Sequence, residues 1–524
     1  MSALEFVCFA AVVLLLYYLL PRKAQPAVML SASVFYCLSV SLFCLVTLLG
    51  VTVNTFFSSI TIERKRSRRA LAVGVLLTLS SFVITKVATL FEGSSVIFRD
   101  GDQALGLAFY SLSAVAYLVD LYRGRIKREK SFLRLFLFVG FFPCLRLGPI
   151  SRYSDLAPQL SHPHAPTWDN ITSGALRVSW GYFKKIVIAD TALVALRTIA
   201  AEPQKFGGGY ALFLIILYSV VIYADFTGGI DVAIGVGRAL GIRLAENFDR
   251  PFASTSVREY WKRWHITLGA FFSDYVFYPV SISNPMRKLS RWLRGGRFKK
   301  AGRHLPIYLA LVLTWLLTGA WHGLSVNFIL WGLSNAVVII ISQELSPFLR
   351  RIEGKIAQNA GKSVQNAGKS VQNAGKSVQS KVKIVQHKEE SEHAKRKCLR
   401  PLAAARTFLI IGSIRLFDLW SNAATAPRTV ISIFSDRVGW TSFFSDGLSP
   451  LGLSASQWIV LALGVALIFA VSRADADCGG RAREPLTKKP FAATACLAIL
   501  VLTTLIFGSY GVGFEESSFI YSQF

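Results

Sequence analysis

The chain has 524 residues, of which 53% are hydrophobic and 17% charged, and its 58 Lys and Arg outnumber its 30 Asp and Glu to give a formal net charge of +28. A soluble domain carries about 25% charged residues, and a disordered chain is far poorer in large aliphatic residues, so both classes are excluded for the bulk of this chain. The apolar residues come in long uncharged runs, which predicts an all-α polytopic membrane protein.

The positive charge fits this class, because Lys and Arg collect in the short cytoplasmic loops of membrane proteins. The sequence contains no basic–aromatic nucleic-acid module, so we expect the lipid bilayer as a partner and no nucleic acid. The 7 cysteines show no CxxC or CxxH spacing, and we interpret most of them as small buried hydrophobes.

Candidate membrane spans need about 20 apolar residues. In chain order they are Leu4–Leu20, Ala27–Phe57, Ala70–Phe91, Ala104–Leu121, Phe132–Ile150, Ala175–Ala200, Tyr210–Gly241, Leu305–Ser342, Leu402–Trp420, Trp458–Val471 and Phe491–Gly508. The first run has no basic segment before it and no small-residue cleavage site after it, so we interpret it as a retained span rather than a signal peptide.

Two of these runs are too long for one crossing. We expect Ala27–Phe57 to make two short crossings. The run Leu305–Gln343 contains no charged residue, and as one helix it would be roughly 58 Å long, about twice the hydrocarbon core. It must turn back, and Gly319–Gly323 is where it can. In total we expect about 11–12 transmembrane or re-entrant helices.

Basic clusters set the orientation, because cytoplasmic loops are positively charged. They lie at 64–69, 123–134, 287–303 and 355–397. With these segments inside, we expect a multi-pass protein of the inner (cytoplasmic) membrane with both termini outside the cytoplasm. The segment 155–264 is too mixed in character for its spans to be counted.

A low-complexity segment interrupts the pattern. From Gln358 the heptad QNAGKSV occurs three times, and a degenerate fourth copy ends at Val385. Lysines recur every seven residues opposite a weak Ala/Val seam, and each repeated Gly costs about 1 kcal/mol in a helix. Two interpretations stay open: a marginal basic helix on anionic lipid, or a tolerated repeat in a cytoplasmic loop.

Polar side chains inside apolar runs are candidate functional residues, because placing them in a membrane is costly. His322 lies in the uncharged run between Gly319 and Gly323, and it is either a catalyst or a packed, hydrogen-bonded residue. His265 ends a cluster of charges and tryptophans that begins at Val257 and is typical of an interfacial anchor.

Asp225 and Asp231 lie near the end of the run Tyr210–Gly241, with glycines between them. They are expected to hold a helix break, to bind a cation, or to pair with Arg238 or Arg243. Two carboxylates at this spacing are weak evidence for a metal, and we predict none.

Short motifs in a fixed order give a family resemblance. The central ones are Asp225-Phe226-Thr227-Gly228, Glu246-Asn247-Phe248, Arg250-Pro251-Phe252, Trp261-Lys262-Arg263-Trp264-His265 and Trp321-His322-Gly323, with upstream motifs at 117–124, 141–143 and 148–150. Their order resembles that of membrane-bound O-acyltransferases, in particular the bacterial branch of alginate O-acetylation and teichoic-acid D-alanine transfer. The last six residues, 519–524, resemble the terminal motif of the polysaccharide-modifying members. The resemblance covers nearly the whole chain except 351–400.

The resemblance implies a helical shell around a central tunnel with His322 near its middle. It divides the chain into N-terminal transmembrane helices (1–130), a catalytic core with both histidine motifs (131–350), a cytoplasmic basic insert (351–400), and C-terminal helices with a short extracytoplasmic tail (401–524). It further implies transfer of an acyl group, most simply acetyl, from a cytoplasmic thioester for O-acylation of an extracellular or cell-wall polysaccharide. The donor would be acetyl-CoA or an acyl carrier, with no tightly bound cofactor, and an extracytoplasmic acyltransferase would be the partner.

Roles for individual residues follow from the same resemblance. His322 would be the general base, His265 would orient the donor or support the tunnel, and Tyr521 would relay the acyl group. The expected substrate-binding residues are Asp225, Asn247, Trp261, Trp264, Asp274, Trp321 and Asn327.

The chain departs from the family pattern at four places: Gly229, Ser273, the segment Ser281-Ile282-Ser283, and Ser522. These departures bear on the acceptor and on partner contacts rather than on the reaction class. Three alternatives are kept: D-alanine transfer to teichoic acid from a carrier-protein thioester, a transporter whose intramembrane His and Asp relay protons, and a scaffold that does not need His322.

Overall fold

The computed structural model describes residues 3–88, 106–296, 301–345, 348, 400–420, 422–477 and 489–509. Within these ranges every regular element is helical, apart from one isolated bridge between Phe248 and Trp264. The described helices that are long and apolar enough to cross a membrane are α3 (Leu42–Lys65), α4 (Arg68–Ala88), α11 (Gly209–Ala239), α16 (Ala301–His322), the helix Val326–Leu345, α21 (Ala455–Asp477) and α23 (Pro490–Phe507). The prediction of an all-α polytopic membrane protein is confirmed.

Shorter helices accompany these spans. Besides the helices that overlap the predicted spans Phe132–Ile150 and Ala175–Ala200, they are α1 (Ala3–Leu19), α2 (Gln25–Val40), α5 (Leu107–Tyr122), α8 (Tyr153–Ser161), α12 (Val257–Arg263), α13 (Ile266–Phe272), α14 (Tyr278–Ser281), α15 (Asn284–Gly295), α19 (Thr425–Ser435) and α20 (Arg437–Asp446). The predicted insert 351–400, with its heptad repeats, lies outside the described residues except for Arg400.

Both long apolar runs are interrupted, and the second turns back as predicted, whereas of the two helices in the first only α3, not α2, is long and apolar enough to cross a membrane. The first is divided at Ser41, which is extended and whose Oγ accepts a hydrogen bond from the Cys44 amide at 3.1 Å to cap α3. The second ends its first helix at His322, and the next helix begins at Val326. The turn therefore places His322 at a helix end instead of inside a continuous span.

The predicted span Phe132–Ile150 is wrong. The segment forms α6 (Phe132–Val139) and α7 (Phe142–Leu145), which have 8 and 4 residues. A helix of eight residues is only about 12 Å long, too short to cross a bilayer. Gly140 divides them where a Cβ would lie 2.7 Å from a Leu48 methyl group, so the segment packs inside the protein.

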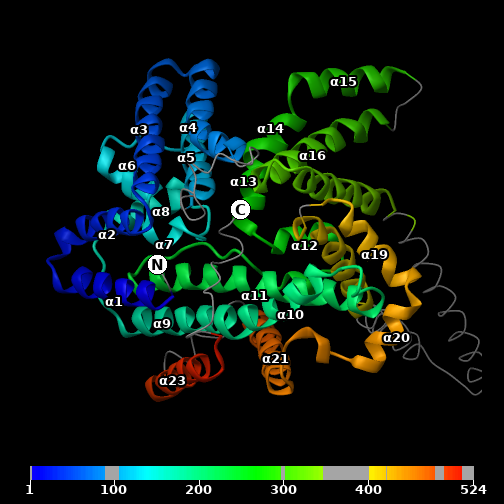
Figure 1. Cartoon of the computed structure of the whole chain (residues 1–524). Coiled ribbons are helices and arrows are strands. Elements are labelled where there is room, and N and C mark those ends of the chain that lie inside the picture. The colour runs from blue at the N-terminus through cyan, green and yellow to red at the C-terminus, as the bar shows by residue number, and fades with distance from the viewer. Residues whose placement is uncertain are drawn as a thin grey trace, which may run out of the picture.

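The predicted span Ala175–Ala200 is a continuous helical stretch made of α9 (Trp168–Tyr182), the π-helical turn η2 (Phe183–Ala189) and α10 (Asp190–Ala201). Figure 1 shows α9 running alongside α11. Two glycine pairs permit this close approach: a Cβ on Gly174 would lie 2.7 Å from the Gly235 carbonyl oxygen, and one on Gly181 would lie 2.6 Å from that of Gly228. Small residues at matching positions let two helix backbones meet in this way.

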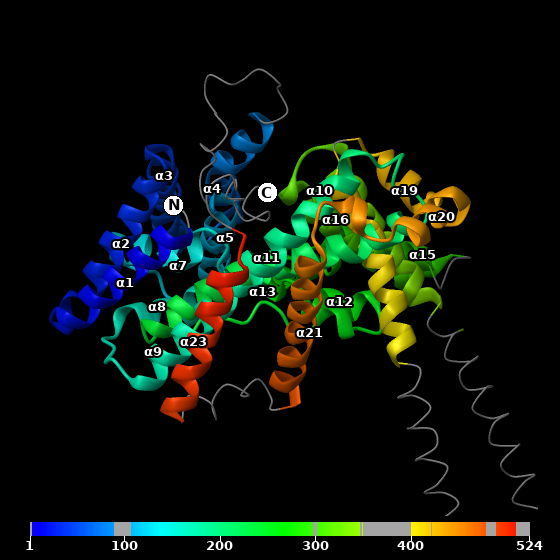
Figure 2. The same ribbon diagram turned by 60° about the horizontal axis from the view of Figure 1, so that its bottom comes forward.

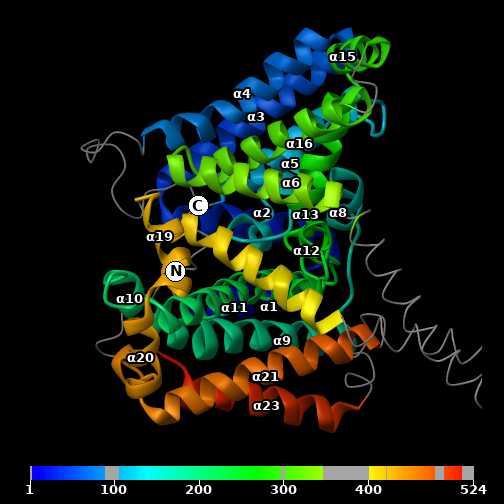
Figure 3. The same ribbon diagram turned by 90° about the vertical axis from the view of Figure 1, so that its right-hand side faces the viewer.

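The core lies around α11. Its described apolar residues pack against η2, α10, α12, α13 and the helix 400–415, and a second cluster joins α1–α3 with α5–α7. Figures 2 and 3 show α21 and α23 on the outer side of the layer formed by α9 and α11. Their outward side chains are apolar, for example Leu463 at 66% and Ile506 at 69% exposure, as expected of helices that face lipid.

Candidate active site

His322 lies at the last residue of α16 inside a wall of aromatic rings. Its ring centroid is 4.8 Å from Trp321, 5.0 Å from Trp331 and 6.2 Å from Phe328, and the residue is buried. The chain turns immediately at Gly323, where a Cβ would lie 2.2 Å from the Phe328 ring, so only glycine fits. The imidazole is therefore held where little water can reach it.

His265 approaches the same site from another part of the chain. It precedes α13 in the left-handed conformation, with φ of 50°, which is uncommon for a residue other than glycine and typical of functional sites. Its ring is 4.8 Å from Phe226 of α11 and 6.1 Å from Trp321, the tryptophan next to His322. Burial lowers the pKa of His265 to about 3, so its ring is neutral at physiological pH. The structure thus brings together His265, Trp321 and His322.

Asn247 fixes the position of His265. Its Oδ1 accepts hydrogen bonds from the amide and hydroxyl of Thr267, both at 2.9 Å, and lies 3.3 Å from His265 Nδ1. The neighbouring bridge between Phe248 and Trp264 pairs the two motifs along their backbones. The motif 246–248 and the motif 261–265, which appear in the sequence only as successive segments, therefore form one local unit.

Of the buried hydrogen-bond donors that lack a partner in the part of the chain that the structure describes, two belong to side chains that contact the histidines. They are Nδ2 of Asn247 and Nε1 of Trp331. Asn247 adjoins His265, and the Trp331 ring contacts His322. Buried donors are rarely left unpaired, so these two atoms fit a site that receives an acceptor oxygen from a bound molecule.

Lys86, near the end of α4, is a site residue that the sequence analysis missed. Its ammonium donates a hydrogen bond to the carbonyl oxygen of His322 at 3.0 Å. It was visible as a lone charge in the predicted span Ala70–Phe91, and such a residue is a functional candidate by default. Its partner is a backbone carbonyl more than two hundred residues further along the chain, so no sequence motif could have predicted the contact.

The predicted substrate-binding residue Trp261 extends the aromatic wall. Its indole Nε1 donates to Oδ1 of Asn335 at 3.1 Å, and its ring lies 4.8 Å from Trp315 and 5.6 Å from Trp331. Trp331 in turn contacts His322. Trp261 therefore reaches the histidine through one intermediate ring.

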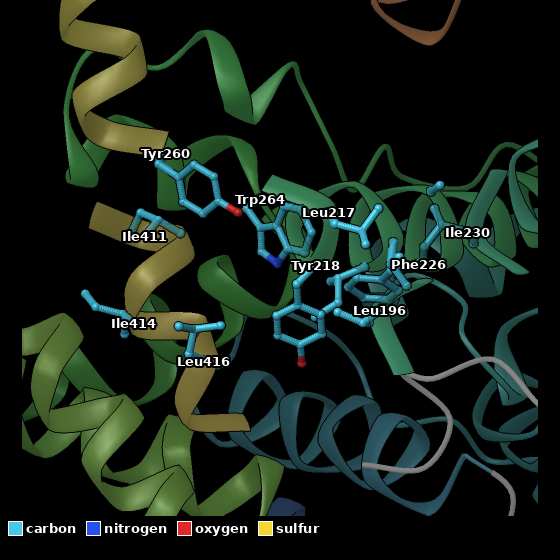
Figure 4. Close-up of a cluster of buried hydrophobic side chains, with 14 of the residues drawn as sticks. Leu196, Leu217, Tyr218, Phe226, Ile230, Tyr260, Trp264, Ile411, Ile414 and Leu416 are labelled. Carbon is cyan, nitrogen blue, oxygen red and sulfur yellow. The ribbon is translucent and has the colours of Figure 1, made fainter. Parts of the chain in front are cut away.

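Trp264 is fully buried and anchors a C-terminal helix to the site. It stacks on Tyr260 with a centroid distance of 5.7 Å, and the guanidinium of Arg415 lies over its ring at 4.0 Å. Figure 4 shows Tyr260 beside Ile411 of this C-terminal segment, with Trp264 adjoining Tyr260. The motif that ends at His265 thus packs between α11 on one side and the segment around Arg415 on the other.

Asp225 belongs to a buried ion network. Lys185 of η2 donates to Asp225 at 2.9 Å and to Asp190 at 2.8 Å. The residue after Asp225, Phe226, contacts His265. Asp225 therefore reaches the site indirectly, through Phe226, and is not part of the aromatic wall.

Asp231 has the same kind of partner. It pairs with Arg177 and with Lys184, each at 2.8 Å, from the neighbouring helical stretch α9–η2. The expected helix break is wrong, since α11 runs unbroken through both aspartates. The expected partner Arg238 forms its ion pair with Asp169 at 2.6 Å.

The remaining predicted residues lie elsewhere. Asp274 is on η4 (Ser273–Phe277), where Arg152 holds its carboxylate at 3.1 Å on the rim of a basic cleft. The amide of Asn327 donates to the backbone carbonyl of Trp420 and ties two segments together. Tyr521 lies outside the described residues. Among those that are described, no three His, Cys, Asp or Glu side chains gather as metal ligands would.

Comparison with known proteins bears on the family. A model of the MBOAT, membrane-bound O-acyltransferase family, matches residues 123–367. The protein named Probable alginate O-acetylase AlgI of Pseudomonas fluorescens is 32% identical over 343 residues, which cover 64% of this chain and 64% of the relative. That of Pseudomonas putida is 30% identical over 354 residues, covering 64% of this chain and 69% of the relative.

A third relative carries a different name. Teichoic acid D-alanyltransferase of Bacillus subtilis is 28% identical over 239 residues, covering 45% of this chain and 58% of the relative. The chain thus spans less than two thirds of the length of the P. fluorescens and B. subtilis relatives.

Proposed function

This chain belongs to the membrane-bound O-acyltransferase family, and we propose that it transfers an acyl group, acetyl by preference, from a cytoplasmic thioester toward an extracellular or cell-wall polysaccharide. The observation that carries the proposal is the buried unit of His265, Trp321 and His322 inside a multi-pass membrane protein. The names of the Pseudomonas relatives support acetyl as the group.

The proposed chemistry uses His322 as the general base. Its neutral imidazole takes the proton of an acceptor hydroxyl while the oxygen attacks the thioester carbonyl and forms a new carbon–oxygen bond. When the carbon–sulfur bond breaks, the imidazolium returns the proton to the leaving thiolate. Nδ2 of Asn247 and Nε1 of Trp331 are donors that suit the oxyanion formed in between. The aromatic wall keeps water from the thioester.

D-alanine transfer from a carrier-protein thioester is the second candidate, and the Bacillus subtilis relative favours it. The terminal hexamer 519–524 favours acetylation, because it resembles the terminal motif of the polysaccharide-modifying members of the family. The acceptor polymer is expected to differ between the two, whereas the histidine chemistry is the same.

The purified chain in lipid nanodiscs tests this choice. We expect thiol release from acetyl-CoA that depends on an oligosaccharide acceptor and yields an acetyl ester detectable by mass. Product from D-alanyl carrier protein alone would establish the second candidate. Folded protein that is inactive with both donors would contradict the enzyme proposal and favour the transporter or the scaffold.

We further propose the arrangement of the chain in the cell. The basic segments 64–69 and 123–134 face the cytoplasm of the inner membrane, and both termini lie outside it. The donor reaches the site from the cytoplasm, and an extracytoplasmic acyltransferase completes transfer to the polysaccharide. Regions 1–130, 131–350, 351–400 and 401–524 serve as N-terminal helices, catalytic core, cytoplasmic insert and C-terminal helices with the tail.

Tyr521 is proposed as an acyl relay on the outer side. A phenol is more acidic than a sugar hydroxyl, and its ester is a better leaving group for the next transfer. We expect Tyr521→Phe to stop polymer acylation without loss of membrane protein, because Phe keeps the ring and loses only the hydroxyl. Peptide mass spectrometry should find a transient acyl group on the C-terminal peptide of the wild type and none in His322→Ala. Wild-type activity of Tyr521→Phe would show that transfer is direct and that the ring only anchors the tail.

A further inference from the structure

Lys86 is the single charged residue of the apolar run Ala70–Phe91, and the proposed reaction does not use it. A lysine near the end of a spanning helix ordinarily turns its ammonium outward to the headgroups and water. The neighbours of Lys86 on α4 place it differently. Val75, Leu79 and Phe82 precede it at the spacing of one helix face, and all three pack against the core cluster around α11. Lys86 therefore continues an inward face of α4.

The partner of Lys86 is the end of the helix that carries the catalytic histidine. Its ammonium donates a hydrogen bond to the carbonyl oxygen of His322 at 3.0 Å. His322 is the last residue of α16, and the final carbonyl groups of a helix have no partner within the helix and form the negative end of its dipole. The turn satisfies one of them, since the Gly323 amide donates to the Gly319 carbonyl at 3.0 Å. Lys86 satisfies another and brings a positive charge to this negative helix end.

A second hydrogen bond fixes the same helix end from the neighbouring helix. Nε1 of Trp321 donates to the carbonyl oxygen of Ala108, in the first turn of α5, at 3.3 Å. Figures 1 and 3 show α4 and α5 near α16. Two consecutive residues of α16 are thus tied to two different helices, one through its backbone carbonyl and one through its indole.

These ties set the distance between the two histidine motifs. The ring of His265 lies 6.1 Å from that of Trp321, and Asn247 holds His265 in its own segment. Helix α16 packs tightly on the helix that follows it, because a Cβ on Gly319 would lie 2.4 Å from the Phe328 carbonyl oxygen. Such internal contacts fix the shape of this helical hairpin but not its place relative to His265. The hydrogen bonds from α4 and α5 fix that place.

We propose that Lys86 is a positioning residue for the acyl transfer. By binding the carbonyl of His322 it holds the end of α16, and with it the imidazole, where the acceptor hydroxyl and the thioester meet. The inference rests on the proposed function and adds a residue to it. A displacement of about 1 Å can cost roughly 10²-fold in rate, so a contact that places only a backbone atom can control the reaction. Lys86 takes no part in the proton transfer, which belongs to His322.

The test removes the ammonium and keeps the aliphatic stem. Lys86→Met has a side chain of similar length without the charged donor. With acetyl-CoA and an oligosaccharide acceptor we expect kcat to fall about 10- to 100-fold, the loss of one charged hydrogen bond, with KM for acetyl-CoA unchanged. Lys86→Arg keeps a charged N–H donor and should recover most of kcat. Lys205→Met, the same substitution at a lysine that is 65% exposed, is the matched control and should behave as the wild type.

A second readout does not depend on activity. Diethyl pyrocarbonate modifies the histidine rings that it can reach, and peptide mass spectrometry follows each histidine separately. We expect His322 to react about tenfold faster in Lys86→Met than in the wild type, because local opening of the helix end becomes easier. His304, which is 51% exposed on the same helix, should react equally in both proteins and is the internal standard.

Three results would overturn the proposal. Unchanged kcat per folded Lys86→Met protein would reduce Lys86 to a membrane anchor. A rise in KM that accounts for the whole loss would show that the ammonium acts on the donor, and modification of His322 at the wild-type rate would show that it does not hold this residue. If Lys86→Met does not fold, Lys86→Gln, which is shorter and uncharged, takes its place under the same criteria. A wild type that transfers no acyl group, together with faster modification of His322 in Lys86→Met, would contradict the proposed function and leave the positioning role standing.

Discussion

His322→Ala is expected to lower acyl transfer by about 10²–10⁴-fold while the protein still accumulates in the membrane. The substitution removes the imidazole that would accept the hydroxyl proton, and the aromatic wall gives water little access to replace it. Because His322 lies at the end of α16 and not within it, loss of the side chain leaves the helix hydrogen bonds intact. The measurement is the initial rate of acetyl ester formation per folded protein, with folding judged by monodisperse elution in detergent.

His304→Ala is the matched control on the same helix. His304 is exposed near the start of α16 and contacts Tyr308 at 3.3 Å, far along the helix from the aromatic wall. It should keep wild-type activity. His265→Ala should also impair transfer, but with a loss of stability, because His265 is packed against Phe226 in a left-handed conformation. Near-normal polymer acylation in cells that carry only His322→Ala would leave only the scaffold or transporter interpretation.

Apolar run length predicted most of the fold, because a bilayer demands about 20 consecutive apolar residues of any span. The same rule failed at Phe132–Ile150. There Phe136, Phe138 and Phe141 are buried at 3% exposure or less inside the protein. A segment buried among helices is as apolar as one that faces lipid, so composition cannot separate the two. Helices such as α19 and α20 were not predicted because they are too short and too polar to register as spans.

The site was predicted unevenly for a physical reason. His322, His265 and Trp321 lie in short motifs, and the structure places them together as contacts of one indole. Partners that come from other segments left no such pattern. The lysines at 184–185 fall inside the predicted span Ala175–Ala200, where the sequence indicated no partner for them, whereas they are the cations that the aspartates of α11 require. These ion pairs form only because α9–η2 packs closely against α11, and that packing could not be predicted from the sequence.

That ion network supports the second large prediction: Lys185→Met is expected to reduce the free energy of unfolding by about 3–5 kcal/mol, the usual cost of removing one partner from a buried pair. Lys185 is buried and holds two carboxylates, Asp225 at 2.9 Å and Asp190 at 2.8 Å. Asp225→Asn should cost less, because the pair of Lys185 with Asp190 remains. We therefore expect Lys185→Met to lose more stability than Asp225→Asn, although Asp225 and not Lys185 belongs to the family motif.

The measurement is the thermal unfolding midpoint in the same nanodiscs, with Lys205→Met as the control, since Lys205 is 65% exposed in an ion pair with Glu202 and should shift the midpoint little. Adding Asp225→Asn to Lys185→Met should recover part of the loss, because one of the two carboxylates then no longer needs a cation. At temperatures where Lys185→Met is folded, its transfer rate tests whether the network also positions His265 through Phe226. If Lys185→Met unfolded at the same temperature as Lys205→Met, the buried carboxylates would be satisfied without this lysine, and Asp225 would regain the substrate-binding role that its motif implied.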